Sequence, residues 1–520
     1  HHPSLFYGLA LVLFIGALLA KTTAFSLPAV ILLLAWWRRG RLNWRADVLP
    51  TLPFFVLSVG MCVMTAWVEK THVGAHGPEF DLSLAQRCLV AGRVFWFYLG
   101  KLFWPAHLCF VYPRWQPDPS VWWQWLYPVA AVGLLLGLWL ARNRIGRGPV
   151  TAAFFYVGTL LPLLGFVSAY AMRYSFVWNH WVYLPSLGPL VLVAAGLELA
   201  RRRAPLFHLP SSILHLPSSI FCLLLPVLGV LTWHEAGQYA DIETLWRSTL
   251  ARNPDCWMAH GNLGMALAAQ GKLADAMQQY DAALTLNPNY VEAHVNRGNL
   301  LTRQGKIREA IAEYDRALEI KPTNVDAHYG LGNALVQQGK PADAIQQYER
   351  ALELDPNNTQ VEANLGSTLA QQGKLPEAIQ HFERAIQLDP NQPGVHLNLG
   401  NALAASGHLP EAIQNFEQEL QMNPDFAQVH VSLGTALATQ GNLGDALQHF
   451  QRALEINPNF AEAHYYSGLA LAGLGKGSDA ISQLQQAAEL AAAQGNIRLA
   501  QAARQRLQAL QPALPPSPPR

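Results

Sequence analysis

The chain has 520 residues, of which 51% are hydrophobic and 14% charged, and its formal net charge is +1. That small value hides an asymmetry, because residues 1–240 carry 17 Lys and Arg against 7 Asp and Glu, whereas residues 241–520 carry 19 against 28. The basic, apolar and Trp-rich first part predicts a membrane domain. The acidic second part predicts a soluble domain and argues against nucleic acid as a partner.

The N-terminal end has the composition of a membrane segment. The chain begins with His-His-Pro and runs directly into an apolar stretch, without the basic start and small-residue cleavage site of a signal peptide. We therefore expect a longer N-terminal part, with further spans, to precede this sequence.

Seven stretches have the apolar character of membrane spans, each of which needs about 20 residues. A further apolar stretch, residues 88–104, contains Arg93 and Lys101 and is predicted to be an interfacial or re-entrant helix. The predicted spans are 4–20, 22–37, 50–67, 121–141, 150–168, 182–200 and 218–233.

Clusters of arginine predict how these spans are oriented. Basic loops stay on the cytoplasmic side, so residues 68–120 and 169–181 are expected on the other side, together with everything after residue 233. The three clusters are Arg38, Arg39, Arg41 and Arg45; Arg142, Arg144 and Arg147; and Arg201, Arg202 and Arg203.

The predicted outer segments hold cations that the orientation rule does not explain. They can anchor the chain at the membrane surface, which we favour for Lys70 and Lys101, or they can bind a lipid-linked phosphate. Arg114 and Arg173 are the stronger phosphate candidates because both lie among aromatic residues. The outer cations are Lys21, Lys70, Arg87, Arg93, Lys101, Arg114 and Arg173.

The cysteines show no metal-binding spacing. Cys62 and Cys222 lie in apolar runs and are predicted to be packing residues. Cys88 and Cys109 can either remain thiols or pair outside the cytosol.

The second part is built on a 34-residue period that begins at Pro254. Each unit has a glycine ten residues and another seventeen residues after its proline, an alanine after twenty-two, and an aromatic residue after twenty-six, replaced by Leu484 in the last unit. This pattern resembles the tetratricopeptide repeat (TPR), a pair of helices that stack into an α-solenoid. The prolines are Pro254, Pro288, Pro322, Pro356, Pro390, Pro424 and Pro458.

The pattern also predicts where helices begin and end. The residue after each proline is expected to cap the first helix, and the second glycine to end it in a tight turn. The expected order is a membrane domain (1–235), a connecting helix (236–253), seven repeats (254–490), a capping helix (491–510) and a disordered Pro-rich tail (511–520). The predicted caps are Asp255, Asn289, Thr323, Asn357, Asn391, Asp425 and Asn459.

Histidine recurs six residues after the repeat proline in six of the units. A shared metal ion is not expected, because zinc holds nitrogens at about 2.0–2.1 Å whereas packed helices lie about 8–10 Å apart. We interpret these histidines as packing or groove residues of the first helix. They are His260, His294, His328, His396, His430 and His464.

Asparagines recur eight and eleven residues after the proline, on one face of the predicted first helix. Amides can pair with the backbone of an extended peptide, because each offers donors and an acceptor; polar solvation of an open groove is the alternative. The series resembles the asparagine ladder of the O-linked N-acetylglucosamine transferase repeats. Its members are Asn262, Asn296, Asn299, Asn333, Asn364, Asn398 and Asn401.

Two segments of the membrane part, RVFWFYLGKLFWPAHLCFVYPRW and MRYSFVWNHWVYLPSLG, followed by a TPR array, resemble the TMTC family. These are transmembrane TPR-containing protein O-mannosyltransferases, related to the C-type membrane glycosyltransferases. The resemblance implies an enzyme that transfers sugar from a polyprenyl-phosphate donor to proteins on the non-cytoplasmic side. It implies no certain cofactor and leaves a divalent metal open.

Two departures from that family put catalysis in doubt. Relatives usually carry an acidic residue just before YLPSLG, where this chain has Asn179 and His180, and the family's first outer loop has no counterpart here. Glu69, Glu79, Asp81 and Asp118 can each act as a general base or be ordinary loop carboxylates. The resemblance and the outer cations together suggest His180 and Asp118 as catalytic candidates and Lys21, Arg93, Arg114, Arg173 and Tyr183 as donor-phosphate ligands.

The sequence thus predicts an all-α chain, a multi-span membrane domain followed by a TPR solenoid, in a bacterial inner membrane or its equivalent. The expected function is transfer of a sugar from a polyprenyl-phosphate donor to Ser or Thr of exported proteins. Membrane lipid and an extended polypeptide in the repeat groove are the expected partners. The alternative is a non-catalytic membrane-anchored TPR scaffold.

Overall fold

The computed structural model describes residues 3–20, 22–73, 80–161, 183–203 and 233–510, together with residues 164, 175, 177, 227 and 229–231. These residues are helical or irregular, and none of them lies in a strand. The chain divides into two compact units, His1–Pro288 and Asn289–Arg520. The all-α fold class predicted from the sequence is confirmed.

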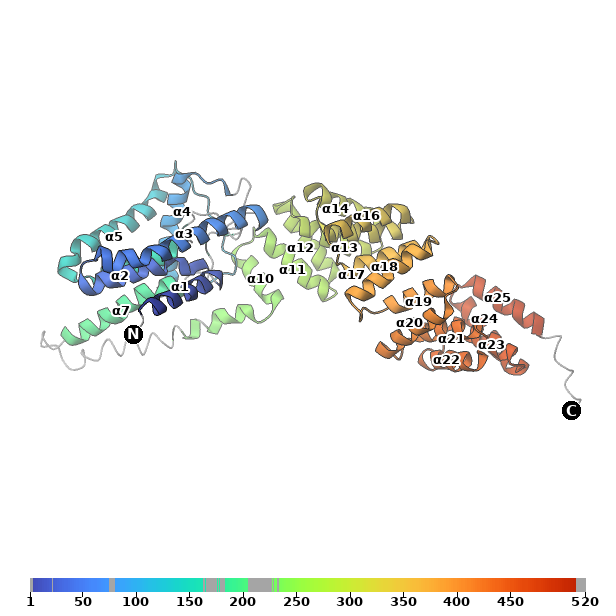
Figure 1. The fold of residues 1–520 in the computed structure, drawn as a ribbon. Helices are drawn as coiled ribbons and strands as arrows, with labels where there is room; N and C mark the ends of the chain where they lie inside the picture. The colour runs from blue at the N-terminus through green and yellow to red at the C-terminus, as the bar shows by residue number, and fades with distance from the viewer. Residues whose placement is uncertain are drawn as a thin grey trace, which may run out of the picture. The chain divides into compact units, whose positions relative to one another are not determined.

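The first unit begins with the apolar helices (Figure 1). The stretches Trp44–Thr71 and Trp122–Ile145 are long and apolar enough to cross a membrane, and three shorter apolar helices accompany them. Large apolar side chains such as Val56 and Leu140 are exposed along these two stretches, as is typical of helices that face lipid. The helices are α1 (Pro3–Ala20), α2 (Leu27–Arg39), α3 (Leu49–Val68), α4 (Leu84–Phe103), α5 (Leu126–Ile145), α6 (Gly148–Leu160) and α7 (Tyr183–Arg203).

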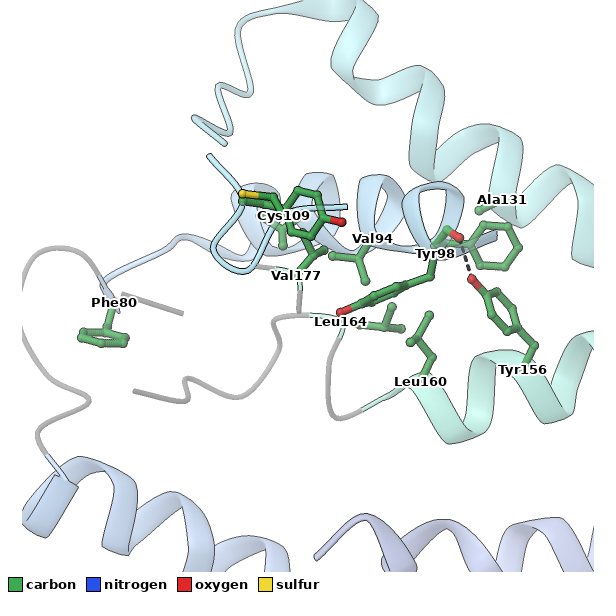
Figure 2. Close-up of a cluster of buried hydrophobic side chains, with 12 residues drawn as sticks. Phe80, Val94, Tyr98, Cys109, Ala131, Tyr156, Leu160, Leu164 and Val177 are labelled. Carbon is green, nitrogen blue, oxygen red and sulfur yellow. Dashed lines mark hydrogen bonds between the residues drawn. The ribbon is translucent and has the colours of Figure 1, made fainter. Parts of the chain in front are cut away.

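Helix α4 lies at the centre of the buried cluster in this part of the chain (Figure 2). One of its faces buries Val94 and Tyr98, and the hydroxyl of Tyr156 on α6 donates a 2.7 Å hydrogen bond to the carbonyl of Phe95. A capping box between Ser83 and Gln86 fixes the start of the helix. The stretch predicted to be an interfacial or re-entrant helix thus packs its apolar residues against α5 and α6, and its position relative to a membrane stays a prediction.

A glycine sets the distance between α4 and α5. A Cβ at Gly92 would lie 2.3 Å from the backbone nitrogen of Pro128, so an alanine there would force the two backbones apart. We expect Gly92→Ala to cost about 1–3 kcal/mol of stability, the usual range for overpacking. Thermal unfolding in detergent should show this, and Gly133→Ala on α5 is the control because no atom lies within 4 Å of its Cβ position. Equal melting temperatures for the two variants would contradict this close packing.

The repeats form pairs of antiparallel helices. In the first unit, α10 (Ile242–Arg252) precedes the first repeat, which consists of α11 (Trp257–Ala269) and α12 (Leu273–Leu286). The second unit continues with α13 (Val291–Arg303), α14 (Ile307–Ile320), α15 (Val325–Gln337), α16 (Pro341–Leu354), α17 (Thr359–Gln371), α18 (Leu375–Leu388), α19 (Val395–Ala405), α20 (Leu409–Met422), α21 (Ala427–Thr439), α22 (Leu443–Ile456), α23 (Ala461–Gly473), α24 (Gly477–Ala493) and α25 (Ile497–Leu510).

The repeat glycines have two different structural roles. In the first six repeats, Gly298 and its equivalents face an aromatic ring of the second helix. A Cβ at these glycines would lie 2.5–2.9 Å from ring carbons, so the absence of a side chain makes room for the ring. Gly305 and its equivalents have φ between 74° and 90° and end the first helix, as predicted. The predicted caps were wrong: the N-cap lies one residue later in six repeats and is Gly394 in the fifth. Two of these N-caps, Asn324 and Asn358, cap with their side chains; that of Asn324 accepts a hydrogen bond from the backbone N–H of Ala327.

Successive first helices of the second unit contact one another, as α13 contacts α15 and α17 contacts α19. No contact of comparable extent joins successive second helices within the described residues. The first helices therefore lie on the inner side of the solenoid in this unit. The exposed residues of these helices form what we call the inner face.

Candidate functional site

A cation–aromatic pair joins α4 to the segment that follows it. The guanidinium carbon of Arg93 lies 4.4 Å from the centroid of the Trp115 ring. The two residues line a narrow pocket of about 10 Å³, with room for roughly one water molecule, together with Gln116, Gln124 and Tyr127. Stacking uses the face of a guanidinium and leaves its N–H groups free to form hydrogen bonds in the guanidinium plane. In the described part of the chain no protein acceptor pairs with Arg93, so these groups are available to an anion.

The other predicted phosphate ligands have different positions. Arg114 is half-buried and directly precedes Trp115 in the chain. Lys101 donates instead to the carbonyls of Ala106 and His107, so it holds the end of α4 against the next segment. Lys21, Arg173 and His180 lie outside the described residues, and Tyr183 is the first residue of α7.

Asp118, a predicted catalytic candidate, forms part of a turn. Its carboxylate accepts hydrogen bonds from the backbone N–H of Ser120 at 2.9 Å and from the Ser120 hydroxyl at 2.7 Å. These hydrogen bonds lower the pKa of Asp118 below its usual range. A carboxylate with a lowered pKa is a weak base, so this arrangement gives Asp118 a structural role.

The segment between α4 and α5 also contacts the start of the repeats, which sequence reasoning did not reveal. Phe110 packs edge-on against Trp246 of α10, with ring centroids 5.4 Å apart. Val111 is fully buried against Cys256 and Ala259 of the first repeat. We call these contacts, together with the polar contacts of Arg252 and Asn253, the junction. It explains why the first repeat belongs to the same compact unit as the apolar helices.

Polar contacts fix the junction. Asn253 donates a 3.2 Å hydrogen bond from its side chain to the carbonyl of Val111, and Arg252 donates to the carbonyl of Leu108. Arg252 also lies 3.4 Å from the carboxylate of Glu235, which is 7% exposed. The only sequence signal for this cluster was a carboxylate directly after the last predicted span, in the sequence HEAGQ.

Cys88 and Cys109, which the sequence left as either free thiols or a disulfide pair, are both free thiols. Cys109 is buried at the junction, with its sulfur 3.1 Å from the carbonyl of Val111. Burial raises the pKa of Cys256, also at the junction, to about 11. Both cysteines are therefore packing residues in this structure.

The repeat histidines join the two helices of each repeat. Nδ1 of His328 lies 2.8 Å from Oε1 of Gln347 on the second helix, and Nε2 lies 3.0 Å from the carbonyl of Pro322. The fourth repeat exchanges the two partners, because Glu362 stands at the histidine position and His381 pairs with it at 2.6 Å. This geometry agrees with the packing interpretation. In the described residues no group of three potential ligands could hold a metal ion.

The sixth repeat pairs two histidines, and this makes it sensitive to pH. Nδ1 of His430 lies 3.1 Å from Nδ1 of His449. Because Nε2 of His430 donates to the carbonyl of Pro424, its Nδ1 accepts when the ring is neutral. Burial and the neighbouring His430 lower the pKa of His449, opposed by Asp445. Protonation of His449 would place a positive charge in this half-buried pair.

A group with a lowered pKa in the folded state stabilises the fold above its unfolded pKa, about 6.5 for histidine. That stability is lost as the pH falls below 6.5 toward the folded pKa. We expect the protection factors of backbone amides in α21 and α22 of the full chain to fall from pH 7.5 to pH 5.5, relative to those in α17 and α18, because burial disfavours the charged form of His449. His449→Gln, which copies the pair of the third repeat, should remove the difference; persistence of the difference in that variant would rule out the pair as its cause.

The asparagine series is only partly available to a ligand. Asn299 and Asn333 accept 2.7 Å hydrogen bonds from the hydroxyls of Tyr314 and Tyr348. Asn364 donates both to Asn333 and to the hydroxyl of Tyr329, each at 2.9 Å. Asn398 and Asn401 are exposed, and their side chains have no partner in the described part of the chain. Asn296 lies on α13, and Asn262 lies on α11 in the first unit.

Comparisons with known proteins agree with the repeat architecture. Residues 264–305 and 298–339 match the TPR repeat model, and residues 329–393 and 397–459 match a second tetratricopeptide repeat model. Among solved structures, the chain is similar to YrrB, described as a TPR protein with an unusual peptide-binding site. The identity is 28% over 35% of this chain and 95% of that one, with a TM-score of 0.32. PilF of Pseudomonas aeruginosa is 22% identical over 42% of this chain and 99% of that one, with a TM-score of 0.39.

A curated relative, protein O-mannosyl-transferase Tmtc1 of Drosophila melanogaster, is 31% identical over 141 residues. The match covers 26% of this chain and 14% of that protein's length. The chain is thus an all-α protein whose repeats form a TPR array, a fold typical of protein–protein interaction, with a partial similarity to an O-mannosyl-transferase.

Proposed function

We propose that this chain is part of a membrane-embedded glycosyltransferase of the TMTC-like class, which transfers a sugar from a polyprenyl-phosphate donor to Ser or Thr of exported proteins. In this proposal the apolar helices hold the lipid tail of the donor, and the TPR array binds the acceptor polypeptide. The partial similarity to Tmtc1 supports the class. The proposal places the array on the non-cytoplasmic side.

One observation carries the proposal: a single segment contacts both Arg93, through the Trp115 ring, and the start of the repeats. At residue 115 this segment stacks on Arg93, and at residues 108–111 it is bonded to Arg252 and Asn253. A donor phosphate bound by Arg93 would therefore lie beside a segment that also contacts the first repeat. Proximity of two reactants in one orientation is a major source of rate enhancement in group transfer.

Arg93 and Arg114 would bind the donor phosphate and stabilise the negative charge that grows on it as the sugar departs. His180, or a carboxylate from the predicted outer loops, would accept the proton of the acceptor hydroxyl. Arg173, Lys21 and Tyr183 complete the proposed donor site.

The test is intact-mass analysis of exported proteins from cells with and without the full gene. Loss of hexose-sized mass increments in the deletion strain supports the transferase. If the masses are unchanged while the array still captures exported proteins, the scaffold is the better description.

A further inference from the structure

The inner face changes character along the second unit. We consider four positions of each first helix, at four, eight, eleven and fifteen residues after the repeat proline, which form one stripe along the helix. In α13 this stripe includes Glu292 and Arg303, in α15 it includes Asp326, and in α23 it includes Glu462. The first helices of the three repeats between them, α17, α19 and α21, have no charged residue at these positions. Their residues are Gln360, Asn364, Ser367 and Gln371; Gly394, Asn398, Asn401 and Ala405; and Gln428, Ser432, Thr435 and Thr439.

These twelve positions are all exposed or half-buried, although most other positions of the same helices are buried. Apart from the buried Glu362 on α17, the acidic and basic residues of these repeats lie on the second helices and in the turns, and some of them pair with one another. Arg452, for example, contacts Glu455 at 2.9 Å and Asp425 at 2.8 Å. The inner face of α17, α19 and α21 is therefore a continuous surface of amides, hydroxyls and small residues.

The hydrogen bonds already made determine what this surface can offer. Asn333 uses both lone pairs of its oxygen, for Tyr348 and Asn364, so its NH₂ group remains as a donor. Asn364 uses its NH₂ group, so its oxygen remains as an acceptor. In the fifth repeat Phe416 replaces the tyrosine and has no hydroxyl to donate to Asn401. The exposed side chains of Asn398 and Asn401 therefore keep both their donors and their acceptors.

An extended polypeptide backbone presents the same groups, one donor and one acceptor per residue. Charged side chains on such a ligand would lose water against this surface without gaining a counter-ion. We propose that the inner faces of α17, α19 and α21 bind an extended polypeptide segment that carries no charged side chains. This inference rests on the proposed function in that the segment would be the Ser- and Thr-containing acceptor.

Binding is measured with the full chain in detergent and a fluorescent peptide of Ala, Thr, Ser, Gly and Pro, without any donor lipid. Versions of this peptide with two Glu or two Lys substitutions should bind at least about tenfold more weakly, the equivalent of 1.4 kcal/mol. Affinity for the neutral peptide should change by less than about twofold between 50 and 500 mM salt, because no ion pair is formed.

The variant that carries both Asn398→Ala and Asn401→Ala should weaken binding at least about tenfold, as expected for two lost hydrogen bonds. The matched control carries Gln414→Ala and Gln418→Ala, two exposed amides on α20, and should bind normally. Unchanged hydrogen exchange in α19 and α20 shows that each variant is folded. Tighter binding of a charged peptide, normal binding by the α19 variant, or displacement of the peptide by a neutral oligosaccharide would overturn the inference.

The failure of this inference is distinguishable from the failure of the proposed function. Sugar transfer to a peptide that the inner face does not select would leave the transferase intact and refute the inference. Binding of the neutral peptide without any sugar transfer would support the inference and refute the proposed transferase.

Discussion

Arg93→Ala should weaken binding of a polyprenyl-phosphate hexose by about 10- to 100-fold, the loss expected for hydrogen bonds to a charged group worth about 1.5–3 kcal/mol. The reason is geometric. Trp115 holds the face of the guanidinium at 4.4 Å and leaves its N–H edge for the phosphate. Arg93→Lys keeps the charge but loses the planar fork and the stacking, so it should fall between the wild type and the alanine variant. Titration of the donor lipid into the purified full-length protein measures the effect.

The chain provides a matched control for this prediction. Arg142 stacks on Trp139 at 4.5 Å, a pair of the same kind within an arginine cluster that is predicted to be cytoplasmic. Arg142→Ala removes the same charge and the same type of contact, and it should leave donor affinity unchanged. Equal effects of the two substitutions would show that general membrane attraction, rather than a site at Arg93, binds the lipid.

Phe416→Ala should cost about 3–5 kcal/mol of stability, the usual cost of removing a buried phenyl ring. Phe416 is 1% exposed, and it fills the space left by Gly400, where a Cβ would lie 2.5 Å from the ring. Because repeat proteins are stabilised mainly by neighbouring contacts, the damage should concentrate in α19 and α20. Hydrogen exchange of the full chain should show these helices opening before α15 and α16.

The control for this prediction is Gln414→Ala, an exposed substitution two residues away on the same helix, which should alter exchange little. Phe416→Ala should also weaken peptide binding if the inner face of α19 carries it. Unchanged exchange in α19 and α20 would mean that the ring does not hold the fifth repeat together.

The repeats could be predicted closely because their signals are local. Proline, glycine and aromatic positions recur in register, and the predicted connecting and capping helices correspond to α10 and α25. The predicted caps were off by one residue in six repeats and by three in the fifth, because Pro, Asn and Asp all favour turns and composition alone does not identify the cap. The predicted Pro-rich tail, residues 511–520, lies outside the described residues.

Contacts between distant segments could not be predicted in the same way. The pairing of Arg93 with Trp115 and the bond of Asn253 to Val111 join residues 22 and 142 positions apart, and no periodicity relates them. Two features of the sequence indicate hydrogen-bonded pairs that were not predicted. Glu362 interrupts the histidine series where His381 appears nineteen residues later, which reveals the hydrogen-bonded pair. The change from Tyr in the first three repeats to Phe in the next three likewise indicates which asparagines are already bonded.

The most direct test of the account is a transfer reaction in one vessel. The full-length protein in lipid nanodiscs receives a polyprenyl-phosphate hexose with a radiolabelled sugar and an uncharged Ser- and Thr-containing peptide. The account predicts that label moves to the peptide and that transfer is lost in both Arg93→Ala and the α19 variant with Asn398→Ala and Asn401→Ala. Label that remains on the lipid while the peptide is bound would contradict it and identify the chain as a scaffold.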